Sequence, residues 1–167
     1  MPVVGEWILQ AAEQEEFRPE AVSEQLGFFP EIFSYLKKRH GDMGRTRPVV
    51  TLATAVTVWA FRQSGDPVRP MPREMLETLW ERLSQGGMGD KLSGFLERME
   101  PNMWHFFLRI TETAAQREQW EQSEIAASAL IYAPVLTSCI YAFWPEEKLP
   151  TLEEGLSSFG LGQGDGE

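Results

Sequence analysis

The two histidines and the single cysteine are the side chains in this sequence best suited to proton transfer, metal binding or nucleophilic attack. Neither His40 nor His105 has a glutamate three residues earlier, because Lys37 and Asn102 stand at those positions. The Glu-x-x-His pattern of di-iron helical bundles is therefore absent. Cys139 lies in a long uncharged stretch, where a thiol is expected to be buried and unreactive. These residues predict neither a di-iron centre nor a thiol nucleophile.

Two further patterns resemble functional motifs without fulfilling them. The glycine-rich segment 86–91 ends in Gly-Asp-Lys and lacks the spacing of a phosphate-binding loop, so we interpret it as a turn between helices. Carboxylate pairs such as Glu97 and Glu100 are expected on exposed faces, where they solvate the protein. No combination of nucleophile, base and orienting group emerges, and we predict a protein without catalytic activity or cofactor.

The longest uncharged stretch, 125–144, predicts the element that the other helices surround. It would form a helix about 30 Å long that is apolar on every side, and such a helix is covered either by other helices or by lipid. Glutamates flank it on both sides, so no excess of Lys or Arg sets an orientation across a membrane. We therefore expect a buried helix and no membrane span. Pro134 predicts a kink or break in it, beside which a pocket could form.

Apolar residues at helical spacing predict amphipathic helices in most of the remaining chain. Two of the predicted apolar faces consist of Val4, Trp7, Ile8 and Ala11, and of Ile32, Phe33 and Leu36. The run from Val49 to Phe61 contains many strand-forming residues, but it is long for a strand and has no β partner, so we expect a helix.

The sequence thus predicts an all-α, single-domain bundle of about seven helices around the central apolar helix 125–144. The domain is expected to span 1–159, with a possible subdivision at the proline-rich loop 64–72. The acidic, glycine-rich tail 160–167 is expected to be disordered.

Charge and cysteine content indicate a cytoplasmic protein. The formal net charge is −10, which makes most of the surface repel nucleic acid. The single cysteine rules out an internal disulfide, and we see no export signal at the N-terminus. One basic island interrupts the acidic character, and it contains Lys37, Lys38, Arg39, Arg45 and Arg47.

Residues 19–39 resemble a helix-turn-helix motif. Val22, Ser23 and Leu26 match the small and apolar positions of its first helix, Gly27 matches the turn, and the second helix follows. With the helix before it, the segment is similar to the DNA-binding part of TetR-type repressors, whose remaining helices bind ligand and dimerise. The resemblance implies DNA contacts from the second helix and the basic island. The candidates for them are Tyr35, Lys37, Lys38, Arg39, Arg45 and Arg47.

Our leading hypothesis is a non-enzymatic protein of adapter or regulatory type that binds another protein, or a second copy of itself. Exposed aromatic residues anchor interfaces, which makes Phe28, Phe29, Trp104 and Phe107 candidate contacts unless they are buried in the core. A helix-turn-helix regulator is the alternative. An acidic protein that neutralises a toxin or mimics nucleic acid is a third possibility.

Overall fold

The computed structural model describes residues 2–14, 24–27, 29–69, 73–85, 89–148, 150 and 154. Phe28 and the predicted tail 160–167 lie outside the described residues. The described residues form the α-helices α1 (Trp7–Gln14), α3 (Pro30–Lys38), α4 (His40–Met43), α5 (Arg47–Arg62), α6 (Arg73–Ser84), α7 (Gly89–Met99), α8 (Pro101–Glu118) and α9 (Gln122–Phe143). Two short 3-10 turns, η1 (Gly44–Thr46) and η2 (Glu146–Lys148), accompany them.

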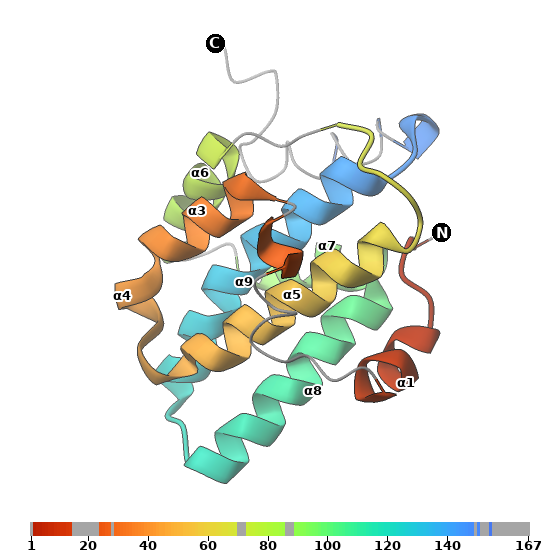
Figure 1. Cartoon of the computed structure of the whole chain (residues 1–167). Helices are drawn as coiled ribbons and strands as arrows, with labels where there is room; N and C mark the ends of the chain where they lie inside the picture. The colour runs from red at the N-terminus through yellow and green to blue at the C-terminus, as the bar shows by residue number, and fades with distance from the viewer. Residues whose placement is uncertain are drawn as a thin grey trace.

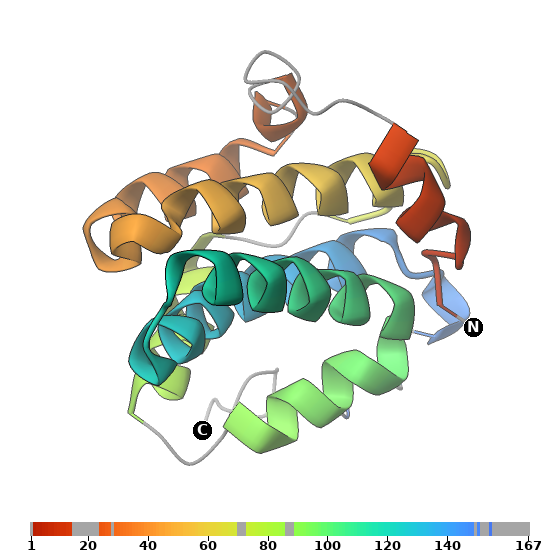
Figure 2. The ribbon, with the colours of Figure 1, turned by 90° about the horizontal axis from the view of Figure 1, so that it is seen from below.

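Helix α9 lies at the centre of the bundle, as the sequence predicts. Its main packing partners are α5 and α6, followed by α7 (Figure 1). Turned by a right angle, the bundle shows α3 and α5 as one layer, α8 and α9 as the next, and α7 on the far side (Figure 2). The prediction of an all-α bundle around the apolar stretch 125–144 is confirmed.

Among the described helices, α9 alone is long and apolar enough to cross a membrane. The rest of the chain already buries 67% of its most apolar window, as expected for a core helix. Glu121 and Glu124 form a capping box at its start, in which each carboxylate accepts a hydrogen bond from the other residue's backbone N–H. The helix continues through Pro134, so the predicted break does not occur.

Helix α5 confirms that the run from Val49 to Phe61 is helical. Thr54 and Thr57 are fully buried on it, and their hydroxyl groups donate to the carbonyl oxygens of Val50 and Ala53 at 2.9 and 2.6 Å. Because these hydroxyl groups are satisfied within their own helix, the threonines can pack in the core.

Two aromatic residues predicted to face inward point to solvent instead. Trp7 is 41% exposed and Phe33 is 49% exposed. On α3 the buried residues are Ile32, Tyr35 and Leu36, which share one face at i, i+3 and i+4. Phe33 follows Ile32 directly and is therefore rotated by about 100° away from that face. The apolar face predicted for α3 was wrong at this position.

Candidate functional site

The aromatic pair predicted to contact a partner lies in the core. Trp104 is 4% exposed and Phe107 is fully buried. The Phe107 ring stacks on that of Tyr132 with 4.1 Å between centroids and 9° between planes, and Trp104 lies on the same tyrosine at 6.3 Å. These contacts connect α8 to α9, so we withdraw Trp104 and Phe107 as contact residues. Phe29 is half-buried against the ring of Phe143 at 5.8 Å.

Tyr35 and Arg39, two of the predicted DNA contacts, are occupied inside the fold. The Tyr35 side chain is fully buried and its hydroxyl donates to the Ile131 carbonyl oxygen at 3.0 Å. The Arg39 guanidinium lies over the Trp80 ring at 3.9 Å and pairs with Glu77 at 3.7 Å. Neither side chain is available to a base edge or a phosphate in this arrangement.

Arg45 is also engaged, at the junction between α8 and α9. Its guanidinium binds both carboxylate oxygens of Glu124, at 2.7 and 2.8 Å, and donates to the carbonyl oxygens of Glu118 and Gln119. The hydrogen bonds from Arg45 are the main reason that the pKa of Glu124 falls to about 2. Arg45 therefore stabilises a turn. Arg45 is nevertheless exposed, as are Lys37, Lys38 and Arg47. Of these, Lys38 pairs with Glu77 at 3.9 Å and Arg47 contacts His40.

The residues considered for chemistry do not form a reactive group. Cys139 is fully buried, and burial raises the pKa of its thiol far above the ordinary range. His105 is exposed on α8 and its Nε2 lies 3.1 Å from a carboxylate oxygen of Glu97. Within the described residues, no three or more His, Cys, Asp or Glu side chains gather where they could hold a metal ion.

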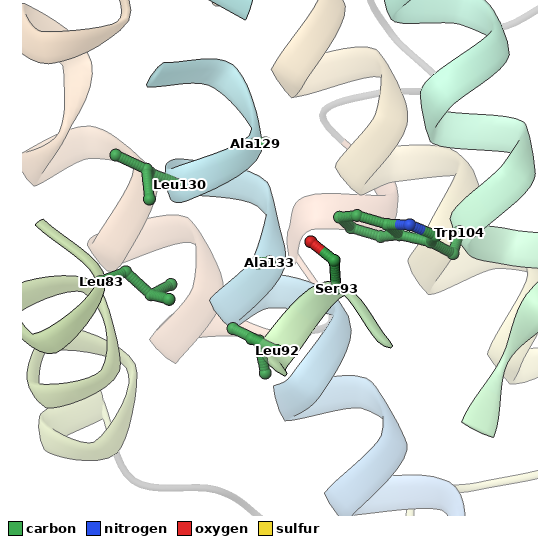
Figure 3. A pocket seen from close by; sticks show the side chains of 7 residues that line it. All are labelled: Leu83, Leu92, Ser93, Trp104, Ala129, Leu130 and Ala133. Atoms are coloured by element: carbon green, nitrogen blue, oxygen red, sulfur yellow. The ribbon is translucent and has the colours of Figure 1, made fainter. Parts of the chain in front are cut away.

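A small cavity lies beside the turn that precedes Pro134. Side chains from α6, α7, α8 and α9 line it (Figure 3), and these are Leu83, Leu92, Ser93, Trp104, Ala129, Leu130 and Ala133. Its volume is about 40 Å³ and its lining is mostly apolar, so it is too small for most organic ligands. Among the described residues, the pocket that we considered near Pro134 is found at this small size.

A buried carboxyl group forms the most unusual site in the described chain. Glu100 joins α7 to α8 and has no exposed surface. Its Oε2 accepts hydrogen bonds from the backbone N–H of Val3 and from Nε1–H of Trp144, each at 2.7 Å. Its Oε1 accepts one from the backbone N–H of Val4 at 3.0 Å. One side chain thus connects the N-terminal segment to the end of α9, which corrects the prediction that Glu100 is a solvated surface charge.

Two opposing effects act on this carboxyl group. Burial raises its pKa, while the N–H donors of Val3, Val4 and Trp144 lower it, and burial is the larger effect. The result is a pKa of about 7. The positive charge of the chain's N-terminal amino group also lowers this pKa, by a smaller amount than the three hydrogen bonds. Glu100 thus lies in the core as a carboxyl group without exposed surface.

The segment that Glu100 holds also forms one wall of a surface groove. This tryptophan groove has a volume of about 290 Å³ and is lined by Val3, Trp7, Ala60, Gln63 and Ser64. The Trp7 ring meets that of Trp59 edge to face at 5.7 Å, which fixes α1 beside α5. Trp7 also packs closely over Gly5, where an added Cβ would lie 2.7 Å from its Cδ1. Sequence reasoning missed this site because it placed Trp7 on the buried face.

Comparisons with protein-family models, with curated proteins and with solved structures find no match for this chain. The resemblance to TetR-type repressors therefore stays a prediction from the sequence. The class that the fold defines is an all-α helical bundle with a partly exposed tryptophan beside an open groove.

Proposed function

We propose that this chain is a non-enzymatic cytoplasmic protein of adapter or regulatory type, which binds another protein through the tryptophan groove. The observation that supports the proposal is the placement of Trp7. Among the described residues it is the largest of the exposed apolar side chains, and it lines a groove. Tryptophan is enriched among the residues that dominate binding energy at protein interfaces.

The groove suits a protein side chain better than a small organic ligand. Its volume lies at the lower limit of ligand pockets, which enclose most of the surface of the molecule they bind. This groove is open, and its lining combines Val3, Trp7 and Ala60 with the amide of Gln63 and the hydroxyl of Ser64. An apolar anchor surrounded by polar groups is the usual composition of an interface centre and its rim.

Site-specific cross-linking tests the proposal. A photoreactive residue replaces Gln63 at the groove, and a matched one replaces Gln116, which is exposed on α8 away from it. We expect a specific partner, or a second copy of the chain, to cross-link at position 63 and not at position 116. The photoreactive residue is activated by light while the protein is in its native cells.

Two substitutions then show whether the capture depends on the groove. Trp7→Ala removes the anchor, and Gly5→Ala displaces the indole ring without removing it. Both are expected to reduce cross-linking at position 63 at least tenfold, whereas Leu108→Ala is expected to leave it unchanged because Leu108 is exposed elsewhere. Equal capture by all variants, or none at position 63, would refute the proposed site.

A further inference from the structure

Residues 2–6 form an irregular segment of bends and a turn, here called the N-terminal strap, that precedes α1. Beyond the two hydrogen bonds from Val3 and Val4 to Glu100, the strap is fixed by Asn102, whose side-chain N–H donates to the Val4 carbonyl oxygen at 2.8 Å. The Val4 side chain is fully buried in the core. Both tethers come from the start of α8, so the position of the strap is set by one short part of the chain.

Glu100 connects the strap to a second segment at the same end of the bundle. Trp144 follows the last turn of α9 and binds the same carboxylate oxygen as Val3 does. In Figures 1 and 2 the start of α1 and the end of α9 accordingly lie toward the same end of the bundle. The Trp144 carbonyl oxygen in turn accepts a hydrogen bond from Arg69 at 2.7 Å. A change at Glu100 is therefore expected to affect three segments that are distant in sequence: the strap, the end of α9 and the segment around Arg69.

From this geometry we infer that Glu100 is a latch: it holds the N-terminal strap in place, and the tryptophan groove exists only while the strap is held. The inference rests on the proposed function in one respect, since it names the groove as the site that the latch controls. The physical reason is that Val3 belongs to both structures. Its backbone N–H donates to Glu100, and the residue lines the groove together with Trp7.

The carboxyl group is suited to such a role because neither of its forms is fully satisfied. The carboxylate accepts three N–H groups but is a charge without exposed surface. The neutral acid avoids the buried charge, yet its O–H competes with three donors that already point at the two oxygens. Because each protonation state of Glu100 has its own free-energy cost, a change in its protonation or its environment changes the strength of its hydrogen bonds to the strap.

Amide hydrogen exchange in the free protein tests the latch without any partner. Glu100→Gln retains the size of the side chain but turns an NH₂ group toward donors that need an acceptor. We expect the amides of Val3 and Val4 to exchange at least tenfold faster in this variant, and the indole N–H signal of Trp7 to shift. Amides in the middle of α5 and α9 are expected to change by less than about threefold, because local opening does not require global unfolding.

Two further variants keep the result interpretable. Glu97→Gln, one turn earlier and exposed, removes a carboxylate that contacts only His105 among the described hydrogen bonds, and it is expected to leave strap exchange unchanged. Asn102→Ala removes the other tether and should speed Val4 exchange severalfold even if the Glu100 variant folds poorly.

Unchanged exchange of Val3 and Val4 in the Glu100 and Asn102 variants would overturn the latch. A uniform increase across α5 and α9 would overturn it as well, because it would show that Glu100 supports the whole fold and not the strap. Faster strap exchange together with an absence of cross-links at position 63 would support the latch and refute the proposed function. The two proposals therefore fail by different observations.

Discussion

Replacing the buried carboxyl group should change how the stability of this protein depends on pH. The pKa of Glu100 is about 7 in the folded protein, against 4.5 for an ordinary glutamate. The folded state therefore holds its proton more tightly than the unfolded state. Stability from this group is fully present below pH 4.5 and is lost as the pH rises through about 7.

The size of the effect follows from the same two pKa values. Each tenfold difference in proton affinity corresponds to about 1.4 kcal/mol, so the full loss is about 3 kcal/mol. Between about pH 5 and about pH 8 the loss amounts to roughly 2.5 kcal/mol. Cys139 and Tyr132, which interact with Glu100, have pKa values raised by burial and do not titrate in this window. The N-terminal amino group also interacts with Glu100, and an ordinary α-amino group titrates at about pH 8, at the upper end of the window.

The assay is urea unfolding of the wild type and of Glu100→Gln, followed by tryptophan fluorescence at several pH values. The glutamine cannot ionise, so its own cost is the same at every pH. The free energy of unfolding of the wild type minus that of the variant is expected to fall by about 2.5 kcal/mol from about pH 5 to about pH 8. A difference that stays flat or rises with pH would refute the reasoning. Glu97→Gln serves as the exposed control.

Three further predictions concern the core. Because the Thr57 hydroxyl donates to the Ala53 carbonyl oxygen, we assign Tyr132 as the donor in the 2.6 Å hydrogen bond between the Tyr132 and Thr57 hydroxyl groups. Thr57→Val, which leaves the buried Tyr132 hydroxyl without its acceptor, should therefore cost about 2–3 kcal/mol in urea unfolding, and Tyr132→Phe, which leaves Thr57 bonded to Ala53, only about 1 kcal/mol. Equal costs would contradict this assignment. Phe107→Ala should destabilise the protein by about 3–5 kcal/mol, whereas Leu108→Ala, at the exposed neighbouring residue, should cost less than about 1 kcal/mol. A mild effect at Phe107 would show that the stacked ring is not part of the core. Cys139 should react with a thiol reagent only as fast as the protein unfolds, because it is fully buried, and rapid labelling of the folded protein would argue against that burial.

The architecture could be predicted because it depends on pattern over long stretches. The run 125–144 contains no charged residue, so a helix formed by it has no charged face to turn to solvent. The folded chain accordingly places α9 in the centre of the bundle. Helix α5 could be predicted from the length of the run and the lack of a β partner, although its valines and threonines favour strands. In both cases many residues contribute to the same conclusion, so errors at single positions do not change it.

The site could not be predicted in the same way, because it depends on single residues. Phe33 and Trp7 each lie one position from a buried neighbour, and a shift of one residue rotates a side chain by about 100°. Glu100 was expected to be solvated like Glu97. The available signal was its register, since Glu100 follows Leu96 by four residues and precedes Trp104 by four, and both are buried. Its hydrogen bonds to the N-terminal strap were invisible to sequence reasoning, because they connect residues 97 positions apart.

The most direct test of this account is a titration of the Glu100 side-chain carboxyl group itself, followed by its ¹³C chemical shift in the intact protein. We expect a midpoint near pH 7, with the amide signals of Val3 and Val4 and the indole N–H signal of Trp144 changing at the same midpoint. A midpoint near the ordinary value of 4.5, with no matching change in these three signals, would contradict the claim that a buried carboxyl group holds the strap and the groove together.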